Sequence, residues 1–363
     1  MYKFEIFTPD TINVEEYENF DHKNLFTTLK WFEFLKEFRH VKPIMIRICD
    51  NSGMFTGYFS GAIQSFTGIR ILGSPFYGWM GQHMGFDLCD EETVIKHVLI
   101  DEIIEFISRN CRISMLMLSD FKFDAEVYEK CSVKLFRDTD HATYFLDLTQ
   151  TENMLFKNFK SGYRTCVRKF EKLGGTIIEE QDESFITEHH KQLTEVFARK
   201  QLSSPNYSKR LHILFSHFPE MVLAINALDA EGHSIASSYY LGNGTLAFFA
   251  SNASLTDHLY YNANQALMWY AIKYWKSKGI KCLDLGGRAE YKANFGAELR
   301  STPAVIWTKH EFMYRLFTGA RKAYYNKFAF IYKLKNIFKK DEKDKKETVE
   351  DTTPETTNTE VNK

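Results

Sequence analysis

Several features that would fix a function class at once are missing from this sequence. No apolar run approaches the roughly 18–20 residues that a membrane-spanning helix needs, and the first residues lack the basic and apolar segments of a secretory signal. The six cysteines are scattered, without a Cys-x-x-Cys pair or metal-ligand spacing. The net charge of −1 excludes a chain-wide attraction to polyanions. We therefore expect a cytoplasmic protein with reduced thiols and without a metal site.

The sequence does contain the material for a large core. Hydrophobic residues make up 44% and aromatic residues 15% of the 363 residues, which is enough for roughly two domains. After Asp341 the apolar residues nearly vanish, and Lys, Glu, Asp and Thr dominate. We expect residues 341–363 to form a disordered tail.

Hydrophobic periodicity predicts an α/β order of elements in the second half of the chain and a truncated version of the same order in the first half. In the first half (residues 1–149) we expect a helix at 29–38, strands at 44–49, 55–65 and 69–72, a helix at 91–108, a strand at 113–118, a helix at 125–130 and a strand at 142–148. In the second half (residues 150–310) we expect a helix at 152–173, a strand at 176–179, helices at 184–200 and 209–217, strands at 221–228, 234–241 and 245–250, a helix at 262–278, and strands at 280–285 and 304–309.

The most informative motif is Asp-Leu-Gly-Gly-Arg-Ala-Glu-Tyr-Lys-Ala-Asn-Phe-Gly at residues 284–296. It follows an apolar run, so we expect Asp284 at a strand end, where a polar side chain can reach a cleft. Gly286 and Gly287 allow positive φ and a close approach of the backbone to a ligand. Lys292 then offers a mobile positive charge. The alternatives are an exposed loop lysine and an Asp that only caps the Gly-Gly turn.

With the helix and strand before it, this motif resembles the C-terminal half of the Fem-type and BioF2-like acyltransferases, which have the GNAT fold. The resemblance implies an α/β (α+β) chain of tandem GNAT-like lobes, each a mixed, mostly antiparallel sheet flanked by helices. It implies that Lys292 stabilises negative charge on the reacting carbonyl oxygen. Asp284 would orient Lys292 or take the proton of the amine, and Tyr291 and Phe295 would contact substrate. Tyr291 stands where the family has Phe.

The resemblance also suggests residues that hold the acceptor. Arg164 and Arg168 share a helix face, and two guanidinium groups there can clamp a phosphate. Arg199 and Tyr207 lie where Fem-type enzymes bind the phosphates of the acceptor, and Lys36 lies where a first-lobe lysine reaches it. The alternative for each cation is a solvated basic face or a favourable charge at a helix C-terminus.

The donor region departs from a typical GNAT domain. An acyl-CoA-dependent GNAT domain carries a glycine-rich turn before the helix that follows its fourth strand, where backbone N–H groups bind the pyrophosphate. Residues 257–264 contain no glycine, a departure that Fem-type proteins share. Asn262 and Asn264 either contact the donor, together with Gly286 and Gly287, or cap the helix. No tightly bound cofactor is expected; the co-substrate is acyl-CoA or aminoacyl-tRNA, and basic clusters at 164–169 and 199–210 could meet a tRNA acceptor stem.

A basic amphipathic helix is predicted at residues 311–340. Residues 315–340 contain eight basic residues and no acidic one, with apolar residues at helical spacing. Such a helix either packs on the domain or makes peripheral contact with the inner face of an anionic membrane.

The sequence therefore predicts an N-acyltransferase that acts on a cell-envelope precursor, such as a peptidoglycan peptide or an amino sugar of a surface polysaccharide. The amine attacks the acyl carbonyl directly, without a covalent enzyme intermediate. The alternatives are aminoacyl transfer to a membrane lipid and a non-catalytic, membrane-associated GNAT-like scaffold. His189 and His190 show no metal spacing, and we expect them to be structural or surface residues.

Overall fold

The computed structural model describes residues 1–323 except 21–22, 67, 77–78, 82, 201 and 203. Residues 1–313 form one compact unit, which carries every element discussed below. Residues 311–323 are helical. The rest of the predicted basic helix and the predicted disordered tail lie outside the described residues. Within the described part, no helix is long and apolar enough to cross a bilayer.

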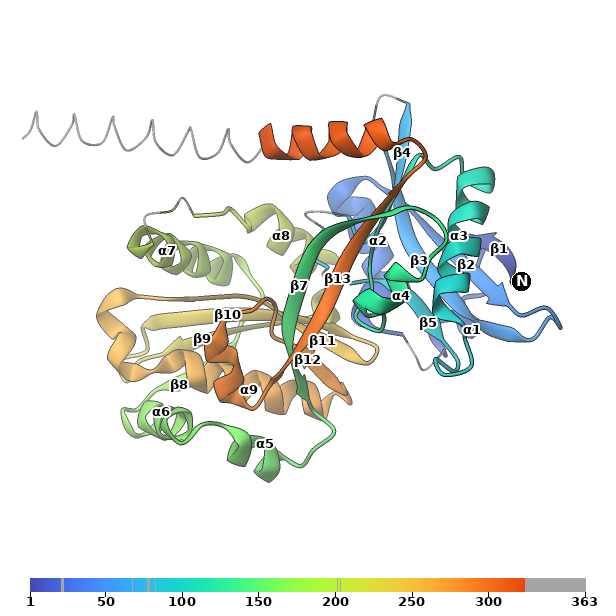
Figure 1. The fold of residues 1–363 in the computed structure, drawn as a ribbon. Coiled ribbons are helices and arrows are strands. Elements are labelled where there is room, and N and C mark those ends of the chain that lie inside the picture. The colour runs from blue at the N-terminus through green and yellow to red at the C-terminus, as the bar shows by residue number, and fades with distance from the viewer. Residues whose placement is uncertain are drawn as a thin grey trace, which may run out of the picture. The chain divides into compact units, whose positions relative to one another are not determined.

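The described strands join into one mixed sheet that runs through both halves of the chain (Figure 1). The strands are β1 (Lys3–Phe7), β2 (Lys42–Cys49), β3 (Phe55–Phe66), β4 (Ile69–Ser74), β5 (Gly85–Leu88), β6 (Met115–Ser119), β7 (Leu135–Asp147), β8 (Thr176–Glu179), β9 (Val222–Leu228), β10 (Ser234–Asn243), β11 (Leu246–Ser254), β12 (Cys282–Asp284) and β13 (Glu298–Thr308). Their order is β1-β2-β3-β4-β6-β13-β7-β12-β11-β10-β9-β8, and β5 pairs with β3.

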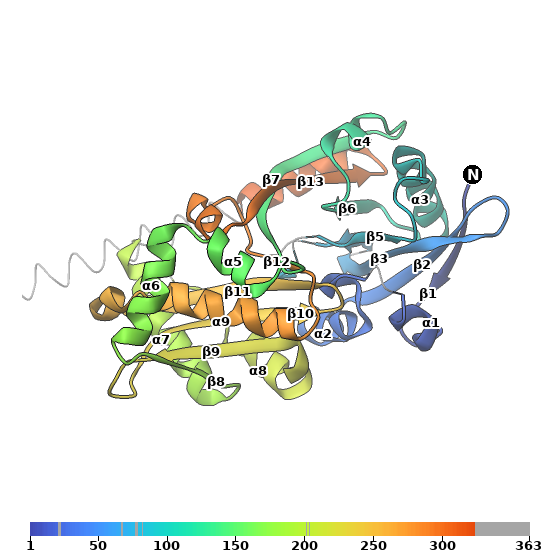
Figure 2. The ribbon, with the colours of Figure 1, turned by 90° about the horizontal axis from the view of Figure 1, so that it is seen from below.

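The helices cover both faces of this sheet (Figures 1 and 2). They are α1 (Val14–Glu18), α2 (Leu29–Arg39), α3 (Lys96–Asn110), α4 (Ala125–Glu129), α5 (Glu152–Asn158), α6 (Ser161–Lys172), α7 (Glu183–Arg199), α8 (Ser208–His217) and α9 (Ala263–Ser277), with the 3₁₀ turns η1 (Leu25–Thr27), η2 (Pro219–Met221), η3 (Thr256–Tyr261) and η4 (Glu290–Phe295). In the second half, α7 and α8 lie over one face of β9–β11, and α9, with α6 packed against it, lies over the other. Different helices therefore cover the two faces of the sheet in this half.

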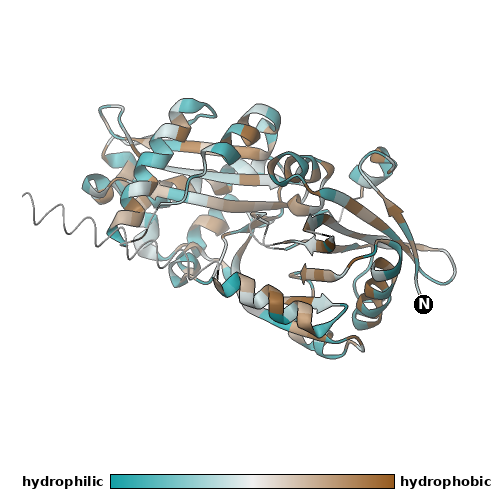
Figure 3. Ribbon diagram, turned by 90° about the horizontal axis from the view of Figure 1, so that it is seen from above, coloured by the Kyte–Doolittle hydropathy of each residue, from teal (hydrophilic) through white to brown (hydrophobic). Residues whose placement is uncertain are grey.

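The apolar residues gather along the strands and on the inner sides of the helices (Figure 3). The first half packs around α3, whose isoleucines and leucine at helical spacing are buried. The second half packs α9 on β9–β11, where small residues such as Ala266 and Ala271 let the helix approach the sheet closely. The hydrophobic stripes that predicted these elements are thus the surfaces that form the core.

The long pair of β7 and β13 joins the two halves. β13 pairs with β6 of the first half on one side and with β7 on the other, and β7 also pairs with β12. The sheet confirms the predicted α/β fold class with a mostly antiparallel sheet. The predicted boundary near residue 150 stays a prediction, because strands on its two sides pair with one another in a single sheet.

Some element boundaries differ from those predicted. The helix expected at 152–173 is two helices, because Phe159 adopts an extended ψ of 137° between them. The helix expected from residue 91 begins at Lys96. β7 and β13 each begin several residues earlier than predicted, because their added residues are mostly polar and lack a regular apolar alternation. β1 and β5 were not predicted.

Candidate active site

The sheet opens beside β11. β11 and β12 pair in parallel from Leu246 opposite Cys282 to Phe248 opposite Asp284, where β12 ends. β11 continues to Ser254. Among the described residues, no strand pairs with this last stretch on the β12 side, so it presents free backbone N–H and C=O groups.

A β-bulge lies in the same stretch of β11. Tyr239 of β10 is opposite Ser251, but Tyr240 is opposite Phe249, so Ala250 is the extra residue. Residues two apart on a regular strand share a face. The bulge instead turns Phe249 toward α9 and Ser251 toward α7, and so gives the two sides of β11 different chemistry.

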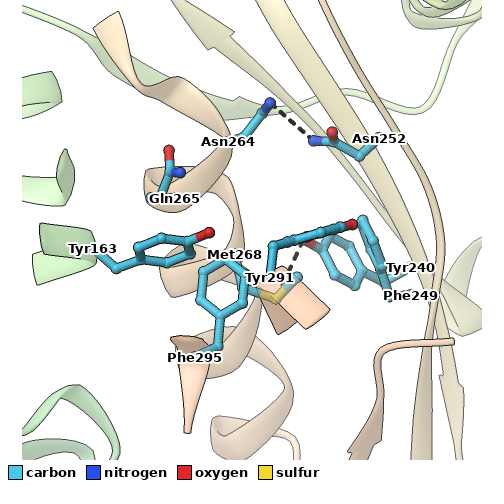
Figure 4. A pocket seen from close by; sticks show the side chains of 9 residues that line it. All are labelled: Tyr163, Tyr240, Phe249, Asn252, Asn264, Gln265, Met268, Tyr291 and Phe295. Atoms are coloured by element: carbon cyan, nitrogen blue, oxygen red, sulfur yellow. Dashed lines mark hydrogen bonds between the residues drawn. The ribbon is translucent and has the colours of Figure 1, made fainter. Parts of the chain in front are cut away.

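A pocket of about 150 Å³ lies on the α9 side of this opening (Figure 4). Aromatic rings and three amides dominate its lining, which consists of Tyr163, Tyr240, Phe249, Asn252, Asn264, Gln265, Met268, Tyr291 and Phe295. Asn252 donates to Asn264 Oδ1 at 3.0 Å. Phe295 is held edge-on between Phe159 and Tyr163. The pocket therefore has apolar walls and side-chain amides. It suits an extended ligand that itself contains amide groups.

Lys292 lies on η4, next in sequence to the pocket residue Tyr291, and is only 8% exposed. Its Nζ is 6.0 Å from the centre of the Phe249 ring and 5.8 Å from that of Tyr291. Burial lowers the pKa of Lys292, and the Asp284 carboxylate opposes this shift. The lysine is therefore an enclosed cation rather than the mobile or exposed loop residue that the sequence suggested.

Asp284 is fully buried at the end of β12. Its Oδ1 accepts hydrogen bonds from the Gly286 N–H at 2.7 Å and from the Thr143 hydroxyl. Its Oδ2 faces His83 Nδ1 at 3.9 Å. Burial raises the pKa of Asp284 to about 6, against the hydrogen bonds and the Lys292 charge. Asp284 thus accepts a hydrogen bond within the Gly-Gly turn, and its charge also raises the pKa of Lys292. The role of Asp284 in catalysis stays a prediction.

The two glycines after Asp284 make this turn possible. Gly286 has a φ of 68° and Gly287 a φ of 62°, which side-chain-bearing residues rarely adopt. The turn leads directly into η4, which contains Tyr291 and Lys292. Tyr291 lines the pocket and is 48% exposed.

The structure places the two predicted donor asparagines at the start of α9. Asn262 has a left-handed φ of 58°, and its side chain donates to the Tyr260 carbonyl rather than to the helix. Asn264 lines the pocket described above. Both also line a second hollow of about 140 Å³ at the N-terminal end of α9. Neither side chain caps the helix, whose first N–H groups lie near this hollow.

Arg164 and Arg168 lie on α6, away from the opening of the sheet. Arg164 donates to the carbonyls of Lys157 and Phe159 at the end of α5. Arg168 lies over the Phe156 ring, 5.6 Å from its centre. The structure thus gives Arg164 a structural contact that fixes the break between α5 and α6.

The remaining predicted acceptor residues are spread over the chain. Arg199 donates to the Thr256 hydroxyl at 2.6 Å and to the Ser254 carbonyl at 3.4 Å, at the far end of β11. Lys36 is exposed on α2. Tyr207 precedes α8 and lies on the α7 side of β10 and β11. These residues do not meet at the pocket that Tyr291 and Phe295 line.

Tyr207 has a partner that the sequence analysis missed. The Arg210 guanidinium lies 3.8 Å from the centre of the Tyr207 ring and donates to the Tyr239 hydroxyl. No salt bridge joins Arg210 to a described acidic residue, and its Nε is buried without a hydrogen bond. The Tyr-x-x-Arg spacing, which puts residues 207 and 210 one helical turn apart, was the signal that could have found it.

Comparisons with known proteins agree with this geometry. A family model described as an acetyltransferase (GNAT) domain matches residues 157–293. The crystal structure of FemX is 12% identical, covers 86% of this chain and 99% of its own, and has a TM-score of 0.66. A conserved protein of unknown function from Bacteroides thetaiotaomicron is 11% identical, covers 85% of this chain and 100% of its own, and has a TM-score of 0.54. No curated protein sequence matches.

These findings confirm the predicted fold group and reaction class. The matched segment contains Asp284, Lys292 and every residue that lines the pocket except Phe295. In the described part of the chain, no group of His, Cys, Asp or Glu side chains could hold a metal ion. The chain thus has the fold of FemX, and its residues 157–293 match a GNAT acetyltransferase domain.

Proposed function

We propose that this protein transfers an acyl group to the amine of a cell-envelope precursor and forms an amide. The observation that carries the proposal is the enclosed Lys292, which lies beside the pocket at the point where the sheet opens. When an amine attacks an acyl carbonyl, negative charge builds on the oxygen, and a pre-positioned cation in a dry site lowers that barrier. Burial lowers the pKa of Lys292, and the charge of Asp284 opposes that shift.

The donor enters on the α9 side. The unpaired edge of β11 offers hydrogen bonds to an extended chain with amides, and the aromatic pocket takes apolar or thioester groups. The N-terminal end of α9 is a favourable place for the phosphates of the same donor. Acyl-CoA has these features in one molecule. Aminoacyl-tRNA is the alternative donor, but its acceptor stem would have to find cations other than Arg164, which is bound to backbone carbonyls.

The acceptor enters on the α7 side. Arg210, supported by Tyr207 and Tyr239, is a cation without a described acidic partner on that face of β10 and β11. Guanidinium groups bind phosphates and carboxylates in two-point contacts. We therefore propose an acceptor that carries an anionic group as well as an amine, as phosphorylated amino sugars and peptidoglycan precursors do.

The test is direct detection of an amide product. The full chain is incubated with acetyl-CoA or with charged tRNA, each with an amino sugar phosphate or a peptidoglycan pentapeptide precursor, and products are identified by mass spectrometry. We expect an acylated amine with at least one donor. A folded protein that forms no product with either donor would contradict the proposed function and favour a non-catalytic scaffold.

A further inference from the structure

A continuous chain of hydrogen bonds crosses the α7 side of the second half. It links seven polar side chains from β11, α7, β10, β9 and the end of β8, namely Ser251, His189, Ser237, Gln192, Ser234, Asn226 and Glu180. The six contacts measure between 2.5 and 3.3 Å. Of the five central members of this relay, from His189 to Asn226, all except Ser234 are almost completely buried. A buried network of this kind persists only if its donors and acceptors match.

The carboxylate at one end fixes the direction of every bond in the relay. Glu180 accepts only, so the Asn226 amide nitrogen donates to it at 2.5 Å. Asn226 Oδ1 therefore faces Ser234, which donates to it at 3.3 Å. Ser234 in turn accepts from the Gln192 amide nitrogen at 2.9 Å. The Gln192 carbonyl oxygen is left to accept from the next serine.

The same logic determines the tautomer of His189. Ser237 donates to Gln192 Oε1 at 2.5 Å, so its oxygen accepts from His189 Nδ1–H at 2.7 Å. His189 Nε2 then carries a lone pair, and the Ser251 hydroxyl donates to it at 2.9 Å. A serine hydroxyl that donates to the lone pair of an imidazole nitrogen has a path along which its proton can move. Burial, and then the Arg210 charge, lowers the pKa of His189 to about 3, so the ring is neutral.

Ser251 lies where the acceptor is proposed to bind. The bulge at Ala250 turns Ser251 to the α7 side, directly opposite Tyr239. The Tyr239 hydroxyl accepts from Arg210, and the His189 ring lies edge-on to Tyr239 at 5.5 Å. Ser251 also belongs to the stretch of β11 that β12 leaves open. It is therefore the end of the relay that is nearest both proposed substrates.

We propose that Ser251 takes the proton of the attacking amine while its own proton passes to His189. This inference rests on the proposed function and adds the base that Lys292, a cation, cannot supply. The amine nitrogen forms a bond to the acyl carbon, and its proton moves to Ser251 Oγ as the Ser251 proton moves to His189 Nε2. When the carbon–sulfur bond of the thioester breaks, the leaving thiolate takes the proton back from the imidazolium by way of Ser251. The serine itself is not acylated.

The relay can be tested without any activity. The nitrogen resonances of His189 in the full chain, assigned by comparison with His189→Gln, report which ring nitrogen carries the proton. We expect the Nδ1–H tautomer between pH 5 and pH 8, at roughly constant shift, and a change at Nε2 in Ser251→Ala. The Nε2–H tautomer, or an Nε2 signal that does not respond to Ser251→Ala, would overturn the relay.

Its catalytic use is tested with acetyl-CoA and glucosamine 6-phosphate, by following thiol release and the N-acetyl product. We expect Ser251→Ala to lower kcat by about 100-fold, the usual size of a general-base effect. KM for acetyl-CoA should stay the same, because the donor pocket is on the other face of β11. Ser251→Thr, which keeps the hydroxyl, should recover most of kcat. Ser119→Ala, at a buried serine whose hydroxyl has no hydrogen-bond partner among the described residues, is the matched control.

The outcomes separate this inference from the proposed function. An unchanged kcat in folded Ser251→Ala, or an acetyl group found on Ser251 by mass spectrometry, would overturn the proton-relay role while the acyltransferase remains. If the wild-type protein acetylates no amine with either donor class, the proposed function fails, and the catalytic use of the relay fails with it. The nitrogen resonances would then still decide whether the relay exists.

Discussion

The two halves of the chain each contain a parallel strand pair, and only one of these pairs opens. In the second half, β11 continues from Phe249 to Ser254 after β12 has ended. In the first half, β4 pairs with β6 up to Ser74, its own last residue. The similar topology therefore leaves a free edge in one half and none in the other.

Packing beyond β4 explains why the first half stays closed. A Cβ at Gly73 would lie 2.5 Å from the Phe76 Cβ and 2.8 Å from the Trp79 ring, and Trp79 is 1% exposed. Aromatic side chains thus fill the space where the second half has its pocket. Beside the parallel pair of the first half, aromatic side chains fill the space and stabilise the fold. Beside the parallel pair of the second half, the space is a pocket that can bind a ligand.

The largest expected effect is on stability, in the closed half. Trp79→Ala should lower the free energy of unfolding by about 3–5 kcal/mol, because it removes a fully buried ring from a tight space. Phe249→Ala, at the open pocket, should cost about 1–2 kcal/mol, because its ring is only partly buried. Urea unfolding of the full chain measures both. Equal decreases in the free energy of unfolding would mean that the two halves are packed alike, and would contradict the difference described above.

The next effect concerns catalysis in the open half. Lys292→Ala should lower the rate of acyl transfer by about 10²–10³-fold, as is usual when one oxyanion-stabilising group is removed. Steady-state kinetics with the product-forming donor and acceptor would show this in kcat. Lys273→Ala, at an exposed lysine on α9, serves as the control. A fully active Lys292→Ala protein would show that the enclosed lysine is structural.

A pH effect follows from the buried imidazole of His189, which Arg210 and His190 face. The pKa of His189 is about 3 in the folded chain, against 6.5 when unfolded. Its contribution to stability is therefore complete above pH 6.5 and declines as the pH falls toward 3, by about 1.4 kcal/mol per pH unit. Urea unfolding at pH 7 and pH 5 should give a smaller difference for His189→Gln than for the wild type. The same difference in both proteins would contradict the assignment.

The sequence predicted the elements and site residues that depend on local sequence patterns. Asp284, Gly286 and Gly287 were identified because a strand end with paired glycines is a local signal. The acyltransferase motif around Lys292 was found for the same reason. The helices and most strands followed from their apolar periodicity.

The parts that depend on distant contacts could not be predicted. Lys292 is buried near Phe249, which is far away in sequence, with its Nζ 6.0 Å from the centre of that ring. Ser251 was overlooked because the bulge at Ala250, visible only in the pairing with β10, decides which way it faces. His189 was expected to be structural or a surface residue, and the structure shows that it is buried and joined to Ser251.

The smallest expected effect concerns residues 315–340. Described residues at the start of this segment, such as Leu316 at 64% exposure, are apolar and accessible. If the basic helix contacts anionic lipid, each lysine or arginine should add roughly 1 kcal/mol at low salt. Sedimentation with phosphatidylglycerol vesicles should show binding that weakens in high salt and is lost on removal of residues 319–363. Binding that is insensitive to this truncation would contradict the prediction.

The most direct test of the account is a calorimetric titration of the full chain with acetyl-CoA. If the open edge of β11 is the donor site, the wild type should bind saturably, and Asn264→Trp, which fills the pocket, should abolish binding while the protein stays folded. Trp79→Ala should bind as the wild type does under conditions where it is folded. Binding that survives Asn264→Trp would place the donor elsewhere and contradict the central claim.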